Sequence, residues 1–345
     1  MNWQEYKKQY KEVGSSIGYP DETIEKLLKY AEPLFKKNVP IIYEQQHLAK
    51  LLGYEYDLLL KISNCQELFY REFSIPKKTG GQRIINEPLP TLKEIQRWLL
   101  DEILLNIKIS PTAKAYVNGL SIKDNARFHK KQKKVLNLDI KDFFGNITER
   151  HVYIMFKTIG YNKQVSSILT QLCCLNGTLP QGAPSSPTIS NIIFRIADKR
   201  IFGYCKKLGI RYTRYADDMT FSGDEIPNAI ILAVKRIISE FGFILNEKKT
   251  KLRLEHQKQV VTAIIVNEKL QVDRGYRRQL RQQIYYIKRY GLINQSKIKG
   301  FDEPIKYLRH LLGKSNFVLF INPKDLETKE YINYLHQLIN STLAL

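Results

Sequence analysis

Long apolar runs are missing from this chain of 345 residues, although 43% of its residues are hydrophobic. No run approaches the roughly 20 apolar residues that a membrane-spanning helix needs, so we expect no membrane partner. The N-terminal sequence MNWQEYKKQYKEV is polar. Because it lacks the apolar segment and the cleavage site of a secretory signal, we expect a cytoplasmic protein.

Cysteine is scarce and is poorly placed for metal binding. The four cysteines are Cys65, Cys173, Cys174 and Cys205. They lack the paired spacing of metal ligands, and two of them are adjacent within an apolar run. We therefore expect reduced cysteines that pack in the interior.

Acidic residues are few relative to basic ones. The chain has 34 Asp and Glu against 55 Lys and Arg, which gives a net charge of +21. Such a balance is expected when the partner is a polyanion, and nucleic acid is the leading candidate. The length suffices for a large core divided into two or three subdomains.

Hydrophobic periodicity predicts a helical beginning, a mixed middle and a helical end. Residues 1 to about 64 favour short helices, one of which begins at Asp21 and would end or kink at Pro33. The extended segment from Glu67, a turn at 79–81 and the segment RIINEP predict a hairpin. The helix after it would begin with a capping box of Thr91 and Glu94. Further helices are expected at 149–158, 162–175, 185–207, 227–241 and 274–290, and strands at 135–140, 243–245, 251–254 and 260–266.

Three acidic residues occupy positions where chemistry is expected. In the segment 135–140, the alternating apolar side chains would share one strand face, and Asp139 would project from the other. Asp217 and Asp218 follow at a tight turn between two short strands. Clustered carboxylates repel each other unless cations neutralise them, and their hard oxygen atoms suit Mg²⁺. Two such ions can promote phosphoryl transfer. The alternative is an ordinary hairpin turn, because Asp is common in turns.

The segment Tyr215-Ala216-Asp217-Asp218 resembles the Tyr-x-Asp-Asp box of reverse transcriptases. Other segments follow in the family's order. LNLDIKDFF resembles the first catalytic strand, LPQGAPSSP the template-and-primer loop, LNEKKTK the lysine motif, and IPKKTGGQRIINEP the fingers hairpin. The resemblance covers about residues 67 to 266. It implies an α+β right-hand polymerase fold with fingers, palm and helical thumb, and an RNA-directed DNA polymerase that uses two Mg²⁺ ions.

The resemblance also implies a role for each matching residue. Asp139 and Asp217 would bind both metal ions, and Asp218 would be a more peripheral ligand. The residues expected at the incoming dNTP are Lys78, Arg83, Phe144, Gln181 and Lys249. Lys78 and Arg83 would hold the triphosphate, with Lys77 as the alternative to Lys78.

The sugar and the two nucleic acid strands have candidate partners as well. Phe144 matches the aromatic gate whose ring would clash with a ribose 2′-OH, unless its neighbour Phe143 takes that position. Gln181 and Gly182 would approach template and primer closely, because glycine has no Cβ. Tyr215 would contact the same strands. A plain loop is the alternative for Gln181 and Gly182.

Two further segments resemble marks of the retron enzymes. Residues 125–129, with Asn125 and His129, resemble their Asn-Ala-x-x-His box, although a packed or solvated helix histidine is the alternative. Retron enzymes then carry Val-Thr-Gly, where this chain has Thr262 followed by Ala263. Glycine would allow close backbone approach to nucleic acid, which the alanine methyl would hinder. Asn125, His129 and Thr262 are therefore candidate RNA-binding residues.

Basic residues and tyrosines alternate between residues 269 and 290. Arg277, Arg278 and Arg281 would contact phosphates, and Tyr285 and Tyr286 would stack on bases. The alternative is a helix that packs its tyrosines on a core and exposes a solvated basic face. In retrons this thumb region recognises a structured noncoding RNA that partly serves as template.

The expected organisation is an N-terminal helical region at 1–66, fingers at 67–134, a palm at 135–266 with interleaved fingers helices at about 149–178, and an RNA-binding thumb at 267–345. We expect the chain to stop after the thumb, without an appended endonuclease or integrase domain.

The resemblance implies that the enzyme copies part of its RNA into RNA-linked single-stranded DNA (msDNA) for antiphage defence. The expected partners are a structured noncoding RNA as template and primer, dNTPs, the RNA–DNA hybrid product and a retron effector protein. One alternative is another bacterial reverse transcriptase, of the group II intron, diversity-generating or abortive-infection type. The other is a catalytically idle scaffold that binds nucleic acid.

Overall fold

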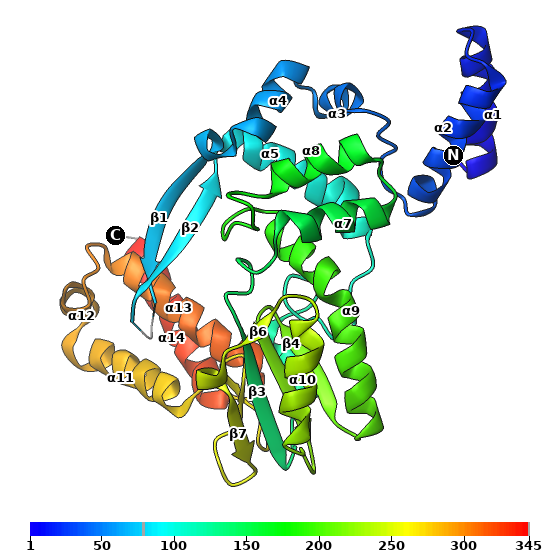
Figure 1. Cartoon of the computed structure of the whole chain (residues 1–345). Coiled ribbons are helices and arrows are strands. Elements are labelled where there is room, and N and C mark those ends of the chain that lie inside the picture. Colours follow the sequence, from blue (N-terminus) through cyan, green and yellow to red (C-terminus); the bar gives the residue numbers. More distant parts are fainter. Residues whose placement is uncertain (78–79, 344–345) are drawn as a thin grey trace. The chain divides into compact units, whose positions relative to one another are not determined.

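The computed structural model describes residues 1–77 and 80–343 and combines helices with short sheets (Figure 1). It confirms the α+β class. The chain divides into two compact units, each built from three separate segments. Unit 1 comprises Met1–Asn118, Ile140–Tyr204 and Ala229–Asn246, and unit 2 comprises Gly119–Asp139, Cys205–Asn228 and Glu247–Leu345. No helix in the described ranges combines the length and the apolar character needed to cross a bilayer.

Unit 1 is mostly helical. Its helices bury one apolar face each, as Ile24 and Leu28 show in α2. Pro33 lies inside α2 and neither ends it nor prevents its last turn. The elements of unit 1 are α1 (Trp3–Ser16), α2 (Asp21–Lys36), α3 (Gln45–Leu52), α4 (Tyr56–Asn64), β1 (Tyr70–Pro76), β2 (Gln82–Pro88), α5 (Pro90–Trp98), α7 (Glu149–Ile159), α8 (Lys163–Cys173), α9 (Ser186–Lys207), α10 (Ala229–Ser239) and β6 (Ile244–Leu245).

The expected hairpin is formed by β1 and β2, which pair antiparallel over their whole length. The capping box predicted for the next helix is wrong. Helix α5 begins at Pro90, with Leu89 at the N-cap and no side-chain cap. Proline suits the first helical position because its missing N–H has no helical partner there anyway. Glu94 instead accepts a hydrogen bond of 2.8 Å from the Tyr54 hydroxyl.

Unit 2 contains the central sheet and the C-terminal helices. The strand order is β4, β5, β3, and β7 pairs with the other edge of β3. The last two residues of β3 belong to unit 1, where they pair with β6. The elements of unit 2 are α6 (Ile122–Phe128), β3 (Lys134–Lys141), β4 (Arg211–Tyr215), β5 (Asp218–Gly223), β7 (Lys251–Leu254), β8 (Val260–Val261), β9 (Ile264–Ile265), α11 (Arg274–Tyr290), α12 (Leu292–Ile298), α13 (Pro304–Ile321) and α14 (Leu326–Leu343).

The strand predicted at 260–266 is two short strands joined by a tight turn. Thr262 and Ala263 form this turn with φ of 45° and 66°. A two-residue hairpin turn with both φ values positive matches the right-handed twist of the strands, and it usually contains Asn or Gly. Neither threonine nor alanine is typical of such a turn, so local sequence does not predict it.

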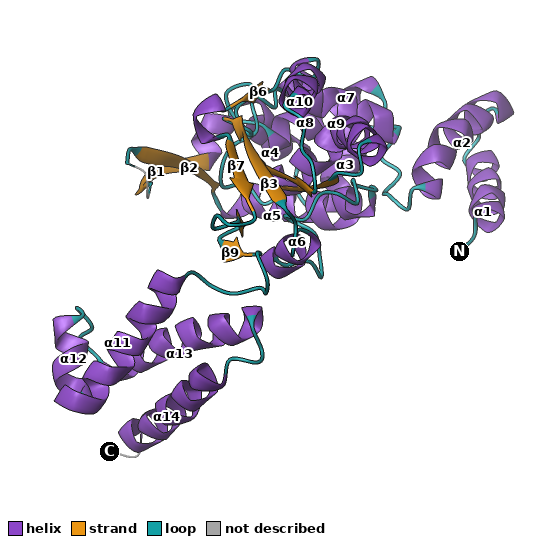
Figure 2. Cartoon of the chain, turned by 90° about the horizontal axis from the view of Figure 1, so that it is seen from below, coloured by secondary structure: helices purple, strands orange, loops and turns teal. Residues whose placement is uncertain are grey.

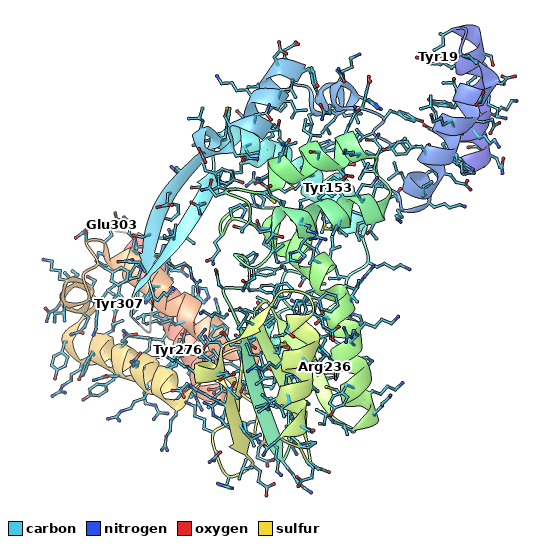
Figure 3. The ribbon with its side chains drawn as sticks, viewed as in Figure 1. Tyr19, Tyr153, Arg236, Tyr276, Glu303 and Tyr307 are labelled. Carbon is cyan, nitrogen blue, oxygen red and sulfur yellow. The ribbon has the colours of Figure 1, made fainter. Side chains whose placement is uncertain are left out.

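The four C-terminal helices share an apolar core, and α13 and α14 run side by side (Figure 2). Leu280 and Ile284 of α11 contribute the buried stripe expected from helical spacing. The ring of Tyr276, labelled in Figure 3, lies 5.9 Å from that of Phe317 in an edge-to-face contact. The Tyr276 ring of α11 therefore stabilises the contact between α11 and α13.

Candidate active site

The Tyr-Ala-Asp-Asp segment forms the predicted turn between two strands. Tyr215 ends β4 and pairs with Asp218, the first residue of β5, so that Ala216 and Asp217 make a two-residue turn. Ala216 has φ of 58°, a left-handed value that costs energy for a residue with a Cβ. Such strain is typical of functional sites, where the surrounding structure holds it in place.

Asp139 and Asp218 lie opposite each other on paired strands. Paired residues of antiparallel strands project from the same face, so the two carboxylates share one face of the sheet. Burial raises the pKa of Asp218 to about 6, and repulsion from Asp217 and Asp139 adds to the shift. Asp217 and Asp139 are therefore close enough to oppose the ionisation of Asp218.

Lys249 partly balances this negative charge. It lies just before β7, and its Nζ donates to Asp139 Oδ2 at 2.8 Å. This hydrogen bond raises the pKa of Lys249 above its ordinary value. The single charge of this ammonium group is smaller than the charge that three adjacent carboxylates carry when all are ionised.

The donor set fits a divalent cation. Within residues 1–77 and 80–343, no three His, Cys, Asp or Glu side chains form a ready metal cage. Mg²⁺ does not need one, because it usually takes one or two carboxylates and completes its shell with water and substrate phosphates. Asp139 and its acidic neighbours offer such carboxylate oxygen atoms.

Arg214 is a residue that the sequence did not single out. Its side chain is fully buried beside the turn between β4 and β5, and Nη1 donates to the Ala216 carbonyl at 3.0 Å. It therefore holds the strained residue of the turn through the main chain. The alternation of residues along β4 does not predict this role, because a buried arginine near the end of a strand has no local sequence signal.

Comparison with known proteins identifies the family. A family model described as reverse transcriptase (RNA-dependent DNA polymerase) matches residues 75–311. The retron Ec86 reverse transcriptase of Escherichia coli is 30% identical to this chain, over 87% of this chain and 91% of the relative. The retron Ec83 reverse transcriptase of the same species is 34% identical, over 80% of this chain and 90% of the relative. The chain belongs to the retron reverse transcriptases.

This membership makes the protein an RNA-directed DNA polymerase, whose family implies a nucleic acid template, nucleotides and a divalent metal. Among solved structures, telomerase from Candida albicans in complex with a fragment of telomeric RNA aligns with 77% of this chain and 64% of that chain, at 11% identity and a TM-score of 0.45.

The residues predicted at the triphosphate lie partly in unit 1 of this reverse transcriptase. Lys78 lies outside the described residues, and its role stays a prediction. Arg83 is exposed on β2, opposite Ile75. An exposed guanidinium on a hairpin is available to a triphosphate. The role of Arg83 also stays a prediction.

Phe143 and Phe144 have clearly different surroundings. Phe143 is 3% exposed and packs against Phe194 and Phe243, with ring centroids 5.7 and 5.6 Å away. Phe144 is only partly buried. Since the Phe143 ring is enclosed by the core of unit 1, Phe144 is the better candidate for the sugar gate, and that role stays a prediction.

The Gln181-Gly182 segment of this polymerase approaches the hairpin of unit 1. Asn86 N donates to the Gln181 carbonyl at 2.8 Å. Gly182 has φ of 131°, and a Cβ at this residue would lie 2.6 Å from the Asn86 carbonyl oxygen. Glycine is therefore required here by the neighbouring strand β2, whatever the loop does toward template and primer, which stays a prediction.

The structure assigns the Asn-Ala-x-x-His box a task inside unit 2. His129 is completely buried, with Nδ1 at 2.7 Å from Ser222 Oγ on β5 and Nε2 at 2.7 Å from Thr213 Oγ1 on β4. The Thr213 hydroxyl donates to Asn125 Oδ1 at 2.6 Å. Because this bond uses the only hydroxyl proton of Thr213, the Nε2–H of His129 is the donor to Thr213.

The box therefore fastens α6 to both strands of the β4–β5 hairpin. Asn125 is 1% exposed and His129 is not exposed at all. These positions argue against the predicted direct contact of either side chain with RNA. Thr262 is half-buried, and its hydroxyl donates to the Ile122 carbonyl at 3.1 Å, so it also contacts α6.

The arginines of α11 fall into two groups. Arg277 pairs with Asp325 at 2.9 Å, and Arg281 donates two hydrogen bonds of 2.7 and 2.9 Å to Glu327. Asp325 directly precedes α14, and Glu327 lies in its first turn. The sequence predicts that Arg277 and Arg281 contact phosphates, but in the structure they already bind the carboxylates of Asp325 and Glu327.

Arg278 and Tyr285 are exposed on α11, and Arg278 makes no ion pair within the described residues. Tyr286 is half-buried and accepts a hydrogen bond of 2.9 Å from Gln282. The contacts of these three residues with RNA stay predictions. Exposure favours Arg278 and Tyr285 over Tyr286.

Proposed function

We propose that this enzyme reverse transcribes part of a structured noncoding RNA into RNA-linked single-stranded DNA, and that it serves antiphage defence. The observation that carries the catalytic part is the placement of Asp139 opposite Asp218, with Asp217 in the adjoining turn. The similarity to retron reverse transcriptases supports the choice of RNA. A retron effector protein would be a further partner.

The proposed metal ligands are Asp139, Asp217 and Asp218, which would hold two Mg²⁺ ions. When bound, such ions activate the attacking hydroxyl and neutralise charge on the leaving oxygen. Lys249 restrains Asp139 through its hydrogen bond and is also a candidate ligand of the triphosphate. Residues 67–134, 135–266 and 267–345 would act as fingers, palm and thumb of a right-hand polymerase.

The remaining roles concern substrate choice. Lys78 and Arg83 would hold the triphosphate, and Gln181 would contact the dNTP and the template. Phe144 would exclude a ribose 2′-OH and so select deoxynucleotides. Tyr215 would contact the template and primer. Its pairing with Asp218 supports this role, because the two residues share one face of the sheet.

Asp217→Asn tests the catalytic assignment. A neutral amide does not balance metal charge, so we expect DNA synthesis to fall by at least about 10³-fold, while RNA binding and the melting temperature are retained. Primer extension with Mg²⁺ on an annealed RNA template measures this. The matched control is Asp224→Asn, which removes an exposed acid that pairs loosely with Lys133 at 3.8 Å. Equal activity of the two variants would refute the metal assignment.

Sequencing the nucleic acid that co-purifies with the protein tests the retron part. The expected result is one structured RNA joined to DNA that is complementary to part of it. The gene for that RNA should lie beside the gene for this chain. A mixture of unrelated cellular RNA without attached DNA would contradict the proposal.

A further inference from the structure

We propose that Lys251 and Arg253, on β7, bind backbone phosphates of the primer strand just behind its growing end. This inference rests on the proposed function, because it takes Asp139 to mark the catalytic end of the primer. Lys251 is the last residue of the LNEKKTK segment, in which the family resemblance assigned a role only to Lys249, and Arg253 lies outside every matched segment.

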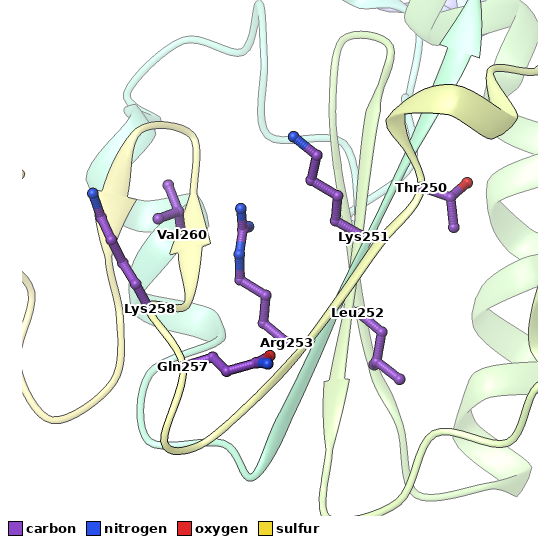
Figure 4. Close-up of a pocket in the computed structure, with 7 residues that line it drawn as sticks. All are labelled: Thr250, Lys251, Leu252, Arg253, Gln257, Lys258 and Val260. Carbon is purple, nitrogen blue, oxygen red and sulfur yellow. The ribbon is translucent and has the colours of Figure 1, made fainter.

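The two side chains line a cavity of about 550 Å³ in unit 2. They project from β7 to the same side, toward β8, whereas Leu252 between them projects to the other side (Figure 4). Thr250, Gln257 and Lys258 complete the polar part of the lining. The cavity therefore presents three cations and an amide, a set of donors that suits an anion.

The charges of Lys251 and Arg253 have no acidic partner within the described residues. Lys258, in contrast, is paired with Asp273. Two cations that project side by side repel each other, and a phosphate between them removes this cost. The cavity is thus electrostatically incomplete in the protein alone.

The strand register places these cations on the catalytic face of the sheet. Lys251 is opposite Asn137 and Arg253 is opposite Val135. Both partners lie at even spacings from Asp139 along β3, and alternate residues of a strand share a face. Lys251 and Arg253 therefore project from the same face as Asp139.

The distances along the strand select the part of the nucleic acid. At about 3.4 Å per residue, Lys251 and Arg253 lie about 7 and 14 Å along the sheet from the level of Asp139. For a primer strand that runs along β3 and rises about 3.4 Å per nucleotide, these levels correspond to about the second and fourth nucleotides from the end. The primer is the strand that ends at Asp139, and we therefore assign the site to it.

Binding of an annealed DNA primer to an RNA template, measured by fluorescence anisotropy at several salt concentrations, tests the site. We expect Lys251→Gln with Arg253→Gln to weaken binding and to reduce the salt slope by about 1.5. The single variant Arg253→Lys should keep the slope, because the charge remains. The control is Lys206→Gln with Lys207→Gln. It removes two exposed charges that precede β4, the strand at the opposite edge of the sheet. An equal effect of the control, or an unchanged slope, would overturn the proposal.

Primers with neutral methylphosphonate links identify the strand and the position. Links at the second to fourth phosphates should weaken binding to the unmodified protein and have little effect on the double variant. Links at the eighth to tenth phosphates should affect both proteins alike. A loss that follows template-strand links instead would refute the primer assignment. Because binding is measured without Mg²⁺ or nucleotide, the outcome is independent of the Asp217→Asn result.

Discussion

The charge of Asp218 determines how strongly the three carboxylates repel each other. Its pKa is raised to about 6 by burial and by its acidic neighbours, against an ordinary value of 3.8. An acid with a raised pKa in the folded state destabilises the fold as the pH rises from the ordinary value to the raised one. The full penalty is present above pH 6, and metal binding should offset it there.

Asp218→Asn should therefore melt at a higher temperature than the unmodified protein in EDTA above about pH 6. The difference should shrink as the pH falls toward 4, because the unmodified side chain becomes neutral. Thermal melting of both proteins between pH 4 and 8 measures this. Adding Mg²⁺ at pH 8 should stabilise the unmodified protein more. A constant difference across this range would show that Asp218 does not interact with Asp217 and Asp139 as described.

Helix α6 is the element that braces the β4–β5 hairpin. His129→Leu keeps the bulk but leaves the hydroxyls of Thr213 and Ser222 without their buried partner. Loss of such bonds costs about 1–3 kcal/mol each, so we expect the free energy of unfolding to fall by about 2–4 kcal/mol. Denaturant unfolding measures the loss. Primer extension should slow while RNA affinity is kept.

The control for this variant is Arg127→Gln, which changes an exposed residue of the same helix. It should leave the free energy of unfolding unchanged. If His129→Leu instead weakens RNA binding and spares stability, the box contacts RNA directly and the bracing role of α6 is wrong.

Local patterns predicted the elements well where a residue's neighbours in sequence decide its structure. The alternation around Asp139 identified β3, and the Asp217-Asp218 pair identified the hairpin turn. They failed where partners are remote in sequence. His129 binds β4 and β5 more than eighty residues later, and Arg277 pairs with Asp325. No periodicity within a helix reveals such partners.

At the scale of the whole molecule, the net charge of +21 does not make every cation a nucleic acid ligand. Arg277 and Arg281 hold α11 to the start of α14, and Asp325 is 6% exposed. A buried carboxylate that loses its partner is destabilising. Arg278 and Arg289 are exposed and have no acidic partner within the described residues. The two pairs should therefore behave differently.

Arg277→Gln with Arg281→Gln should lower the free energy of unfolding by about 1–3 kcal/mol. Arg278→Gln with Arg289→Gln should leave stability unchanged, weaken cognate RNA binding and reduce its salt slope by about 2. Thermal melting and salt-dependent RNA binding of both variants measure this. Equal RNA affinity of the exposed-pair variant and the unmodified protein would show that this face of α11 does not bind RNA.

The close approach of Gly182 to Asn86 has a mechanical consequence within unit 1. The base of the β1–β2 hairpin is fastened to the Gln181 carbonyl, and no side chain separates the two backbones. The hairpin and the Gln181-Gly182 loop are thus joined at Asn86. If the whole hairpin shifts, the loop has to shift with it. If only the part beyond Asn86 shifts, the strands have to bend between Asn86 and Gln82.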